Sequence, residues 1–127
     1  MNYIRFTTFI PDPESGRYLG LFQLLGIMEE EGVMSDYEIV WMKNAIEWFD
    51  NNLKEPNTFS RSRKKHAKQV GLSWYKSTAN EHINKMYELV EILRNHNIQV
   101  NILKTNKPGY VVFEDEYQTV AEPFVDN

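Results

Sequence analysis

Two side chains have a type and a position that suit acid–base chemistry. His82 lies at the edge of an apolar helical stripe, and imidazole titrates close to neutral pH. Glu122 lies late in the last predicted strand, opposite Tyr110 in the expected hairpin register. If the third predicted helix packs on this hairpin, these three side chains would join Lys76 in one polar pocket of a small enzyme or small-molecule binder. The alternative for His82 is a partly buried histidine that a single hydrogen bond satisfies.

Other catalytic and metal-binding patterns do not occur in the sequence. The three histidines, at positions 66, 82 and 96, include no pair at i and i+4, so no zinc site is expected. The acidic triplet at 114–116 lacks the spaced oxygens and the glycine of a calcium loop. There is no cysteine, no glycine-rich phosphate loop and no GxSxG motif. We therefore expect no metal and no cofactor.

The segment FSRSRKKHAKQ, residues 59–69, concentrates positive charge in a chain that is acidic as a whole. We call its five cations the basic run and add two residues beyond its end as candidate binding residues. The basic run is Arg61, Arg63, Lys64, Lys65 and Lys68, and the added residues are Trp74 and Lys76. On a helix most of the run would share one face, because spacings of three and four residues place side chains side by side.

Three interpretations of the basic run stay open. Lysine and arginine beside a nucleic acid gain free energy by releasing counterions, and Phe59, Trp74 and Tyr75 could stack on unpaired bases. The run could instead meet an acidic surface on a protein partner. In the third interpretation it is a solvated linker whose charge is balanced by acids of the same chain.

Charge is also segregated along the whole sequence. Residues 1–60 contain four basic and ten acidic side chains, whereas residues 61–107 contain ten basic and three acidic ones. Residues 108–127 contain five acidic and no basic side chains, and the net charge is −4. Such segregation is typical of a binding face. It also allows a homodimer in which the basic block of one copy meets the acidic tail of another.

Length and composition predict one folded domain. The 127 residues include 42% hydrophobic side chains, with seven Phe, seven Tyr and three Trp, which suffice for a core. We expect a single domain over 1–127, with a flexible basic connection at 54–72. No apolar run is long enough for a bilayer, no secretory signal opens the chain, and cysteine is absent. A soluble cytoplasmic protein without a membrane partner is therefore expected.

Hydrophobic periodicity predicts the order of elements. Strands are expected over 3–10 and 98–105, and helices over 17–31 and 35–53, the second opened by a capping box of Ser35 and Glu38. A third helix begins at Ser73 or Thr78, and a hairpin of 109–115 and 117–124 turns at 114–117. The result is an α+β fold: a mainly antiparallel four-stranded sheet, made of the N-terminal strand plus three C-terminal strands, with about three helices packed on one face.

Three blocks of the sequence resemble a group of small uncharacterised bacterial proteins. They are WF followed by NL and a proline at 48–56, SWYKSTANEHI at 73–83, and KPGYVVFEDEYQTVAEPF at 107–124. Lys107 and Phe113 depart from the arginine and tyrosine expected in the last block. The resemblance implies a bacterial, cytoplasmic protein and brings no activity and no catalytic residues. The charge segregation then favours a non-enzymatic domain that binds another macromolecule through residues 61–76.

Overall fold

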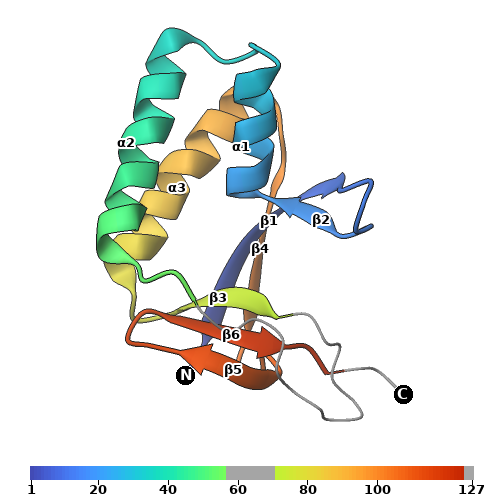
Figure 1. The fold of residues 1–127 in the computed structure, drawn as a ribbon, viewed down its shortest axis with the longest axis vertical. Coiled ribbons are helices and arrows are strands. Elements are labelled where there is room, and N and C mark those ends of the chain that lie inside the picture. The colour runs from blue at the N-terminus through green and yellow to red at the C-terminus, as the bar shows by residue number, and fades with distance from the viewer. Residues whose placement is uncertain (57–70, 125–127) are drawn as a thin grey trace. The chain divides into compact units, whose positions relative to one another are not determined.

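The computed structural model describes residues 1–56 and 71–124, which contain three helices and six strands (Figure 1). In chain order these are β1 (Tyr3–Pro11), β2 (Tyr18–Gly20), α1 (Leu21–Glu30), α2 (Asp36–Asn52), β3 (Leu72–Lys76), α3 (Asn80–Asn95), β4 (Val100–Thr105), β5 (Tyr110–Glu114) and β6 (Gln118–Glu122). No helix in these ranges is both long and apolar enough to cross a membrane.

The strands form one open sheet in the order β2-β1-β3-β6-β5, and β4 also pairs with β1. The pairs β1–β2, β1–β3, β3–β6 and β5–β6 are antiparallel. The α+β class is therefore confirmed, but the predicted count of four strands is wrong. Of the two additional strands, β2 lies in a stretch that the periodicity assigned to a helix, and β3 covers the earlier of the two predicted starts of the third helix, Ser73.

The chain divides into two compact units, which we name the hairpin unit and the helical unit. The hairpin unit contains Met1–Arg5, Leu53–Ile83 and Lys104–Asn127, and the helical unit contains Phe6–Asn52 and Asn84–Leu103. Three elements, β1, α3 and β4, each contribute residues to both units.

In the hairpin unit, β3 is a central strand. It pairs with β1 through Tyr3–Lys76 and Ile4–Tyr75, and with β6 over four residues. Every residue of β6 is buried. The β5–β6 hairpin turns where the sequence predicted, because the Asp115 carboxylate accepts hydrogen bonds from the backbone N–H groups of Tyr117 and Gln118 at 2.9 and 3.0 Å. A side chain that captures the following N–H groups in this way stabilises a tight turn.

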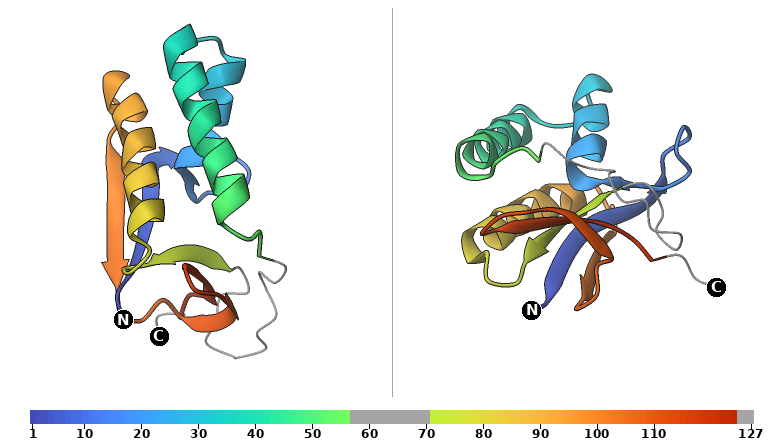
Figure 2. Two further views of the ribbon diagram at one scale, coloured as in Figure 1. Left: turned by 90° about the vertical axis from the view of Figure 1, so that its left-hand side faces the viewer. Right: turned by 60° about the horizontal axis from the view of Figure 1, so that its bottom comes forward.

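In the helical unit, α1 runs toward the short loop that joins it to α2, and α2 runs back from that loop on the same side (Figure 2). The rings of Phe22 and Phe49 meet edge to face at 5.3 Å and tie α1 to α2. Phe6 of β1 meets Tyr87 of α3 in the same way. The buried apolar side chains of this unit are Phe6, Leu19, Leu21, Leu24, Leu25, Met28, Met34, Met42, Ala45, Phe49, Met86, Leu89, Val90, Ile92 and Leu93.

The first helix is shorter than the sequence predicted. Tyr18–Gly20 pairs with β1 as β2, so α1 begins only at Leu21. Tyr18 is consequently 53% exposed, and its ring contacts Phe9 rather than the helical core. The period of three and four that placed Tyr18 on the helix was therefore misleading, because pairing with the preceding strand β1 overrides the helical periodicity at residues 18–20.

The third helix begins later than predicted, at Asn80, because residues 72–76 form β3. Trp74 and Tyr75 suit a strand, since aromatic side chains fit a pleated and partly buried surface. The strand depends on partners far away in the sequence, β1 and β6, which periodicity within one segment cannot reveal. Within α3 itself the apolar stripe is buried, with Met86, Val90 and Leu93 among its residues.

Candidate functional site

The basic run itself, Arg61, Arg63, Lys64, Lys65 and Lys68, lies outside the residues that the structure describes. The two residues added to it, Trp74 and Lys76, lie in β3. Trp74 is only 9% exposed and pairs with Thr119 of the fully buried strand β6. Little of its indole is therefore accessible to a nucleobase or a partner.

Lys76 is held inside the hairpin unit by acids of the same molecule. Its Nζ lies 2.7 Å from Glu114 Oε1, and its side chain is 15% exposed. Burial alone would raise the pKa of the nearby Asp115. However, hydrogen bonds from the Gln118 side chain and from the backbone of Tyr117 and Gln118, together with the charge of Lys76, hold that pKa below its ordinary value. Lys76 is therefore paired with an acid beside the hairpin turn, and most of its side chain is covered.

His82 is buried among aromatic rings of the hairpin unit. It is 4% exposed, its ring centroid lies 4.4 Å from that of Tyr117, and Tyr75 is the next ring at 6.4 Å. The charge of Glu116 first, and then burial, raise the pKa of the Tyr117 hydroxyl, and burial raises the pKa of Tyr75. Both phenols thus keep their protons at neutral pH and can donate hydrogen bonds, but they cannot act as bases.

Glu122 lies at the opposite end of the hairpin. It is fully buried and pairs with Tyr110 in the register that the sequence predicted. The backbone of Gly109 approaches the Glu122 carbonyl closely at this end. The Tyr110 ring contacts Phe124 at 4.8 Å.

The polar pocket predicted from four side chains is therefore divided. Lys76 and His82 lie near the turn, beside Tyr117, whereas Glu122 and Tyr110 lie at the open end of the hairpin. Four residue steps along β6 separate the two ends, which is about 13 Å in an extended strand. A single small substrate cannot contact both pairs of groups at hydrogen-bonding distance. The carboxylate and the imidazole thus do not form one acid–base site.

A surface that the sequence analysis missed lies on α2. The exposed fractions of Tyr37 and Val40 are 74% and 59%, and Val33 in the preceding loop is 51% exposed. Trp41 is half-buried, and its ring lies 6.0 Å from that of Tyr37. We name these four residues, Val33, Tyr37, Val40 and Trp41, the α2 ridge. On the helical wheel Tyr37 lies about 140° from the buried Met42, so its ring points away from the core.

Acidic side chains border the α2 ridge. Asp36, Glu47 and Asp50 are exposed, and Asp36 and Glu47 lie on the same side of the helix as Val40 by their spacing of four and seven residues. The single basic residue of α2, Lys43, pairs with Glu29 at 3.5 Å. The exposed face of α2 is therefore both apolar and negatively charged.

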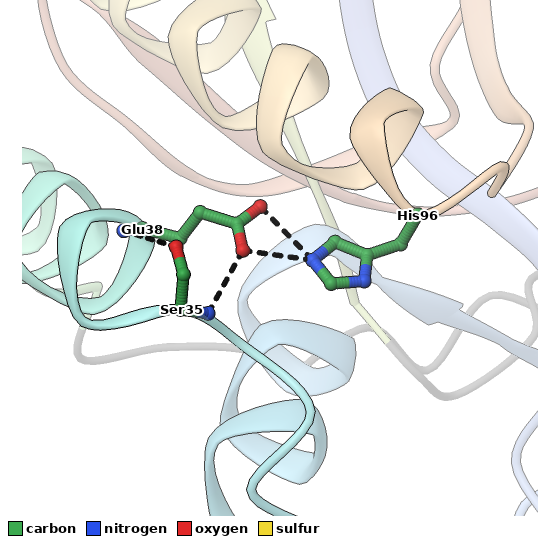
Figure 3. Close-up of polar contacts among 3 residues, drawn as sticks. All are labelled: Ser35, Glu38 and His96. Atoms are coloured by element: carbon green, nitrogen blue, oxygen red, sulfur yellow. Dashed lines mark hydrogen bonds and ion pairs between the residues drawn. The ribbon is translucent and has the colours of Figure 1, made fainter.

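The start of α2 is joined to the end of α3 by a buried acid (Figure 3). Glu38 is 8% exposed; its Oε1 accepts the Ser35 backbone N–H at 3.0 Å, and the Ser35 hydroxyl accepts the Glu38 N–H at 3.2 Å. This confirms the predicted capping box. His96 Nε2 lies 2.9 Å from Glu38 Oε2, a contact that the sequence did not predict. The Ser35 backbone hydrogen bond first, and then His96, hold the pKa of Glu38 below its ordinary value despite burial.

Within residues 1–56 and 71–124, no group of three or more histidine, aspartate or glutamate side chains is arranged to hold a metal ion. Comparison with known proteins finds no matching family model, no matching curated protein and no matching solved structure.

Proposed function

We propose that this chain is a non-enzymatic binding domain of the bacterial cytoplasm, and that its basic run contacts an acidic surface of a protein partner. The observation that carries the proposal is the concentration of charge: five cations lie within residues 61–68 of a chain whose net charge is −4. The bacterial and cytoplasmic setting comes from the resemblance of the three sequence blocks.

The distribution of the other cations supports the proposal. In the described part of the positive block, Lys76, Lys85 and Arg94 pair with Glu114, Glu88 and Glu91 of the same molecule. The excess of positive charge in residues 61–107 thus comes chiefly from the basic run. A dense cluster of cations raises the association rate with an acidic partner and improves electrostatic complementarity.

A protein partner is favoured over a nucleic acid because of the aromatic residues beside the run. Binding of single strands relies on exposed rings on which bases stack. Trp74, in β3, is 9% exposed, and Tyr75 is half-buried next to His82. Neither ring offers a free stacking surface, and the acidic whole chain would repel a phosphate backbone outside the run.

The test compares two fluorescent probes, a polyglutamate peptide and a DNA oligonucleotide, by anisotropy with the full chain over a series of salt concentrations. We expect salt-sensitive binding of polyglutamate. The variant with Arg63→Gln, Lys64→Gln, Lys65→Gln and Lys68→Gln should bind at least about tenfold more weakly, because each lost charge contact contributes a few tenths of a kcal/mol or more. The matched control is Lys104→Gln with Lys107→Gln, two exposed lysines outside the run.

Three outcomes would overturn the proposal. Binding of DNA with a steep salt dependence, and not of polyglutamate, would assign the run to nucleic acid. Equal losses in the run variant and in the control would show that only the total charge matters. If neither probe binds, the run has no acidic partner.

A second candidate function is a small-molecule site at the turn end of the hairpin. The observation that favours it is the burial of His82 against Tyr117, close to the ion pair of Lys76. Such a site would no longer include Glu122 or Tyr110. It would be preferred over the binding domain if His82→Gln, and not the basic-run variant, abolished the binding of a small anion such as acetate or phosphate.

A further inference from the structure

We infer that the α2 ridge and its acidic border form a docking surface for the basic run of a second copy of this chain. The inference rests on the proposed function, since it identifies the acidic protein surface that the run would contact. It goes beyond that proposal because it assigns a site to the described helix α2 and makes the partner a copy of the same protein.

The first argument is that the ridge is exposed within one copy. Tyr37 and Val40 have exposed fractions of 74% and 59%, and Val33 adds a third exposed apolar side chain at 51%. Contiguous exposed apolar residues with a polar rim are typical of interaction surfaces. Aromatic residues in particular are enriched among the groups that dominate binding energy.

The second argument is chemical complementarity. The rings of Tyr37 and Trp41, 6.0 Å apart, offer aromatic faces on which a guanidinium or ammonium group binds favourably. Asp36 directly precedes Tyr37, and Glu47 lies six residues beyond Trp41 on the side of the helix that carries Val40; both are exposed carboxylates that can pair with the other cations of the segment. A segment that combines arginine, lysine and an apolar residue therefore fits this surface.

The third argument is that the chain itself contains such a segment. Residues 59–69 combine Phe59 with the two arginines and three lysines of the basic run. In an isologous dimer each copy would give its run to the partner's α2 and receive the partner's run on its own, so that the contact is made twice and the assembly closes. This differs from the dimer considered from the sequence, in which the basic block met the acidic tail.

The experiment measures the mass of the full chain in solution by sedimentation velocity over a range of concentrations. We expect a dimer that dissociates as salt rises from about 0.05 M to about 0.5 M, because the screening length shortens severalfold over this range. We define a face variant, which carries Glu47→Lys and Asp50→Lys, and a run variant, which carries Lys64→Glu and Lys65→Glu. Each of the two variants should be monomeric. The control, Lys104→Glu with Lys107→Glu, has the same change of charge as the run variant and should remain dimeric.

Mixing the face variant with the run variant gives the sharpest readout. In the mixed dimer the unaltered basic run of the face variant contacts the unaltered α2 of the run variant. The second contact joins the altered run, now negative, to the altered α2, now positive, so these charges are also opposite. We therefore expect dimers to reappear in the mixture although neither variant dimerises alone. A further variant, Tyr37→Ala with Val40→Ala, should weaken the dimer about tenfold or more by removing the apolar contact. Its binding of polyglutamate should be as strong as that of the wild type or stronger, because the partner's α2 then competes less for the run.

The results separate failure of this inference from failure of the proposed function. If the run variant loses polyglutamate binding but the wild-type chain is monomeric at every concentration, the proposed function stands and the second copy is not the partner. If a dimer forms and the face variant leaves it intact, the partner surface is not on α2 and the inference is wrong. If the run variant still binds polyglutamate like the wild type, the proposed function fails.

Discussion

At the scale of single residues, Glu38 shows how one side chain can serve two elements. Its carboxylate accepts the Ser35 backbone N–H that would otherwise be unsatisfied at the start of α2, and it meets His96 at the end of α3. Removal from water opposes ionisation of Glu38, yet the hydrogen bonds prevail and keep its pKa low. The capping box could be predicted from the serine and the glutamate three residues apart. The contact with His96 could not, because it depends on how α3 ends near α2.

The lowered pKa of Glu38 leads to a prediction for stability in acid. In the unfolded chain the group titrates near its ordinary value of 4.5, so the stabilisation is complete above that pH and is lost as pH falls through the lower folded value. Glu38→Gln should reduce the free energy of unfolding at neutral pH by about 1–3 kcal/mol and flatten its decline below about pH 5. Urea titrations at a series of pH values measure both effects.

The control for this variant is Glu30→Gln, which replaces an exposed carboxylate. It should change the free energy of unfolding by less than about 0.5 kcal/mol at any pH. If Glu38→Gln kept the same acid dependence as the wild type, Glu38 would not be the group whose protonation weakens the fold.

At the scale of elements, the sequence predicted best where structure is local. The helix α2, the strand β4 and the turn between β5 and β6 follow from a cap, a short apolar run and a charged turn within a few residues. The strand β3 was missed because its partners lie far away in the sequence, as in the pair of Trp74 with Thr119. The strand β2 was missed because three residues are too few to show a strand period, although its pairing of Tyr18 with Pro11 is local. The pocket predicted from His82 and Glu122 is divided because His82, on α3, lies beside Tyr117 near the hairpin turn, whereas Glu122 lies at the open end of the hairpin.

The open end of the β5–β6 hairpin depends on a glycine. Gly109 has φ of +133°, and a Cβ at this position would collide with the backbone carbonyl of Glu122. Backbone atoms of a buried strand cannot move aside as a flexible side chain would. Gly109→Ala should therefore lower the free energy of unfolding by at least about 2 kcal/mol, as judged by thermal and urea denaturation.

Gly26 provides the matched comparison for this substitution. It lies inside α1, where an added Cβ meets nothing within 4 Å. Gly26→Ala should raise stability by about 0.5–1 kcal/mol, because alanine favours the helix and restricts the unfolded chain. If Gly109→Ala were equally well tolerated, the close approach to Glu122 would not constrain the hairpin.

At the scale of the whole molecule, some properties depend on the net charge alone, and others depend on where the charged residues lie. Two double variants have the same change of charge: the run variant, Lys64→Glu with Lys65→Glu, and the control variant, Lys104→Glu with Lys107→Glu. Each lowers the net charge by four units, from −4 to −8. Properties that depend on net charge, such as the isoelectric point near 5.4 and the pH of lowest solubility, should fall equally in the two variants. Isoelectric focusing and solubility measured against pH test this equality. If the run variant lowered the pH of minimum solubility much further than the control variant, contacts made by the basic run would govern how the molecules associate near neutral pH. Total charge alone would then not explain the association.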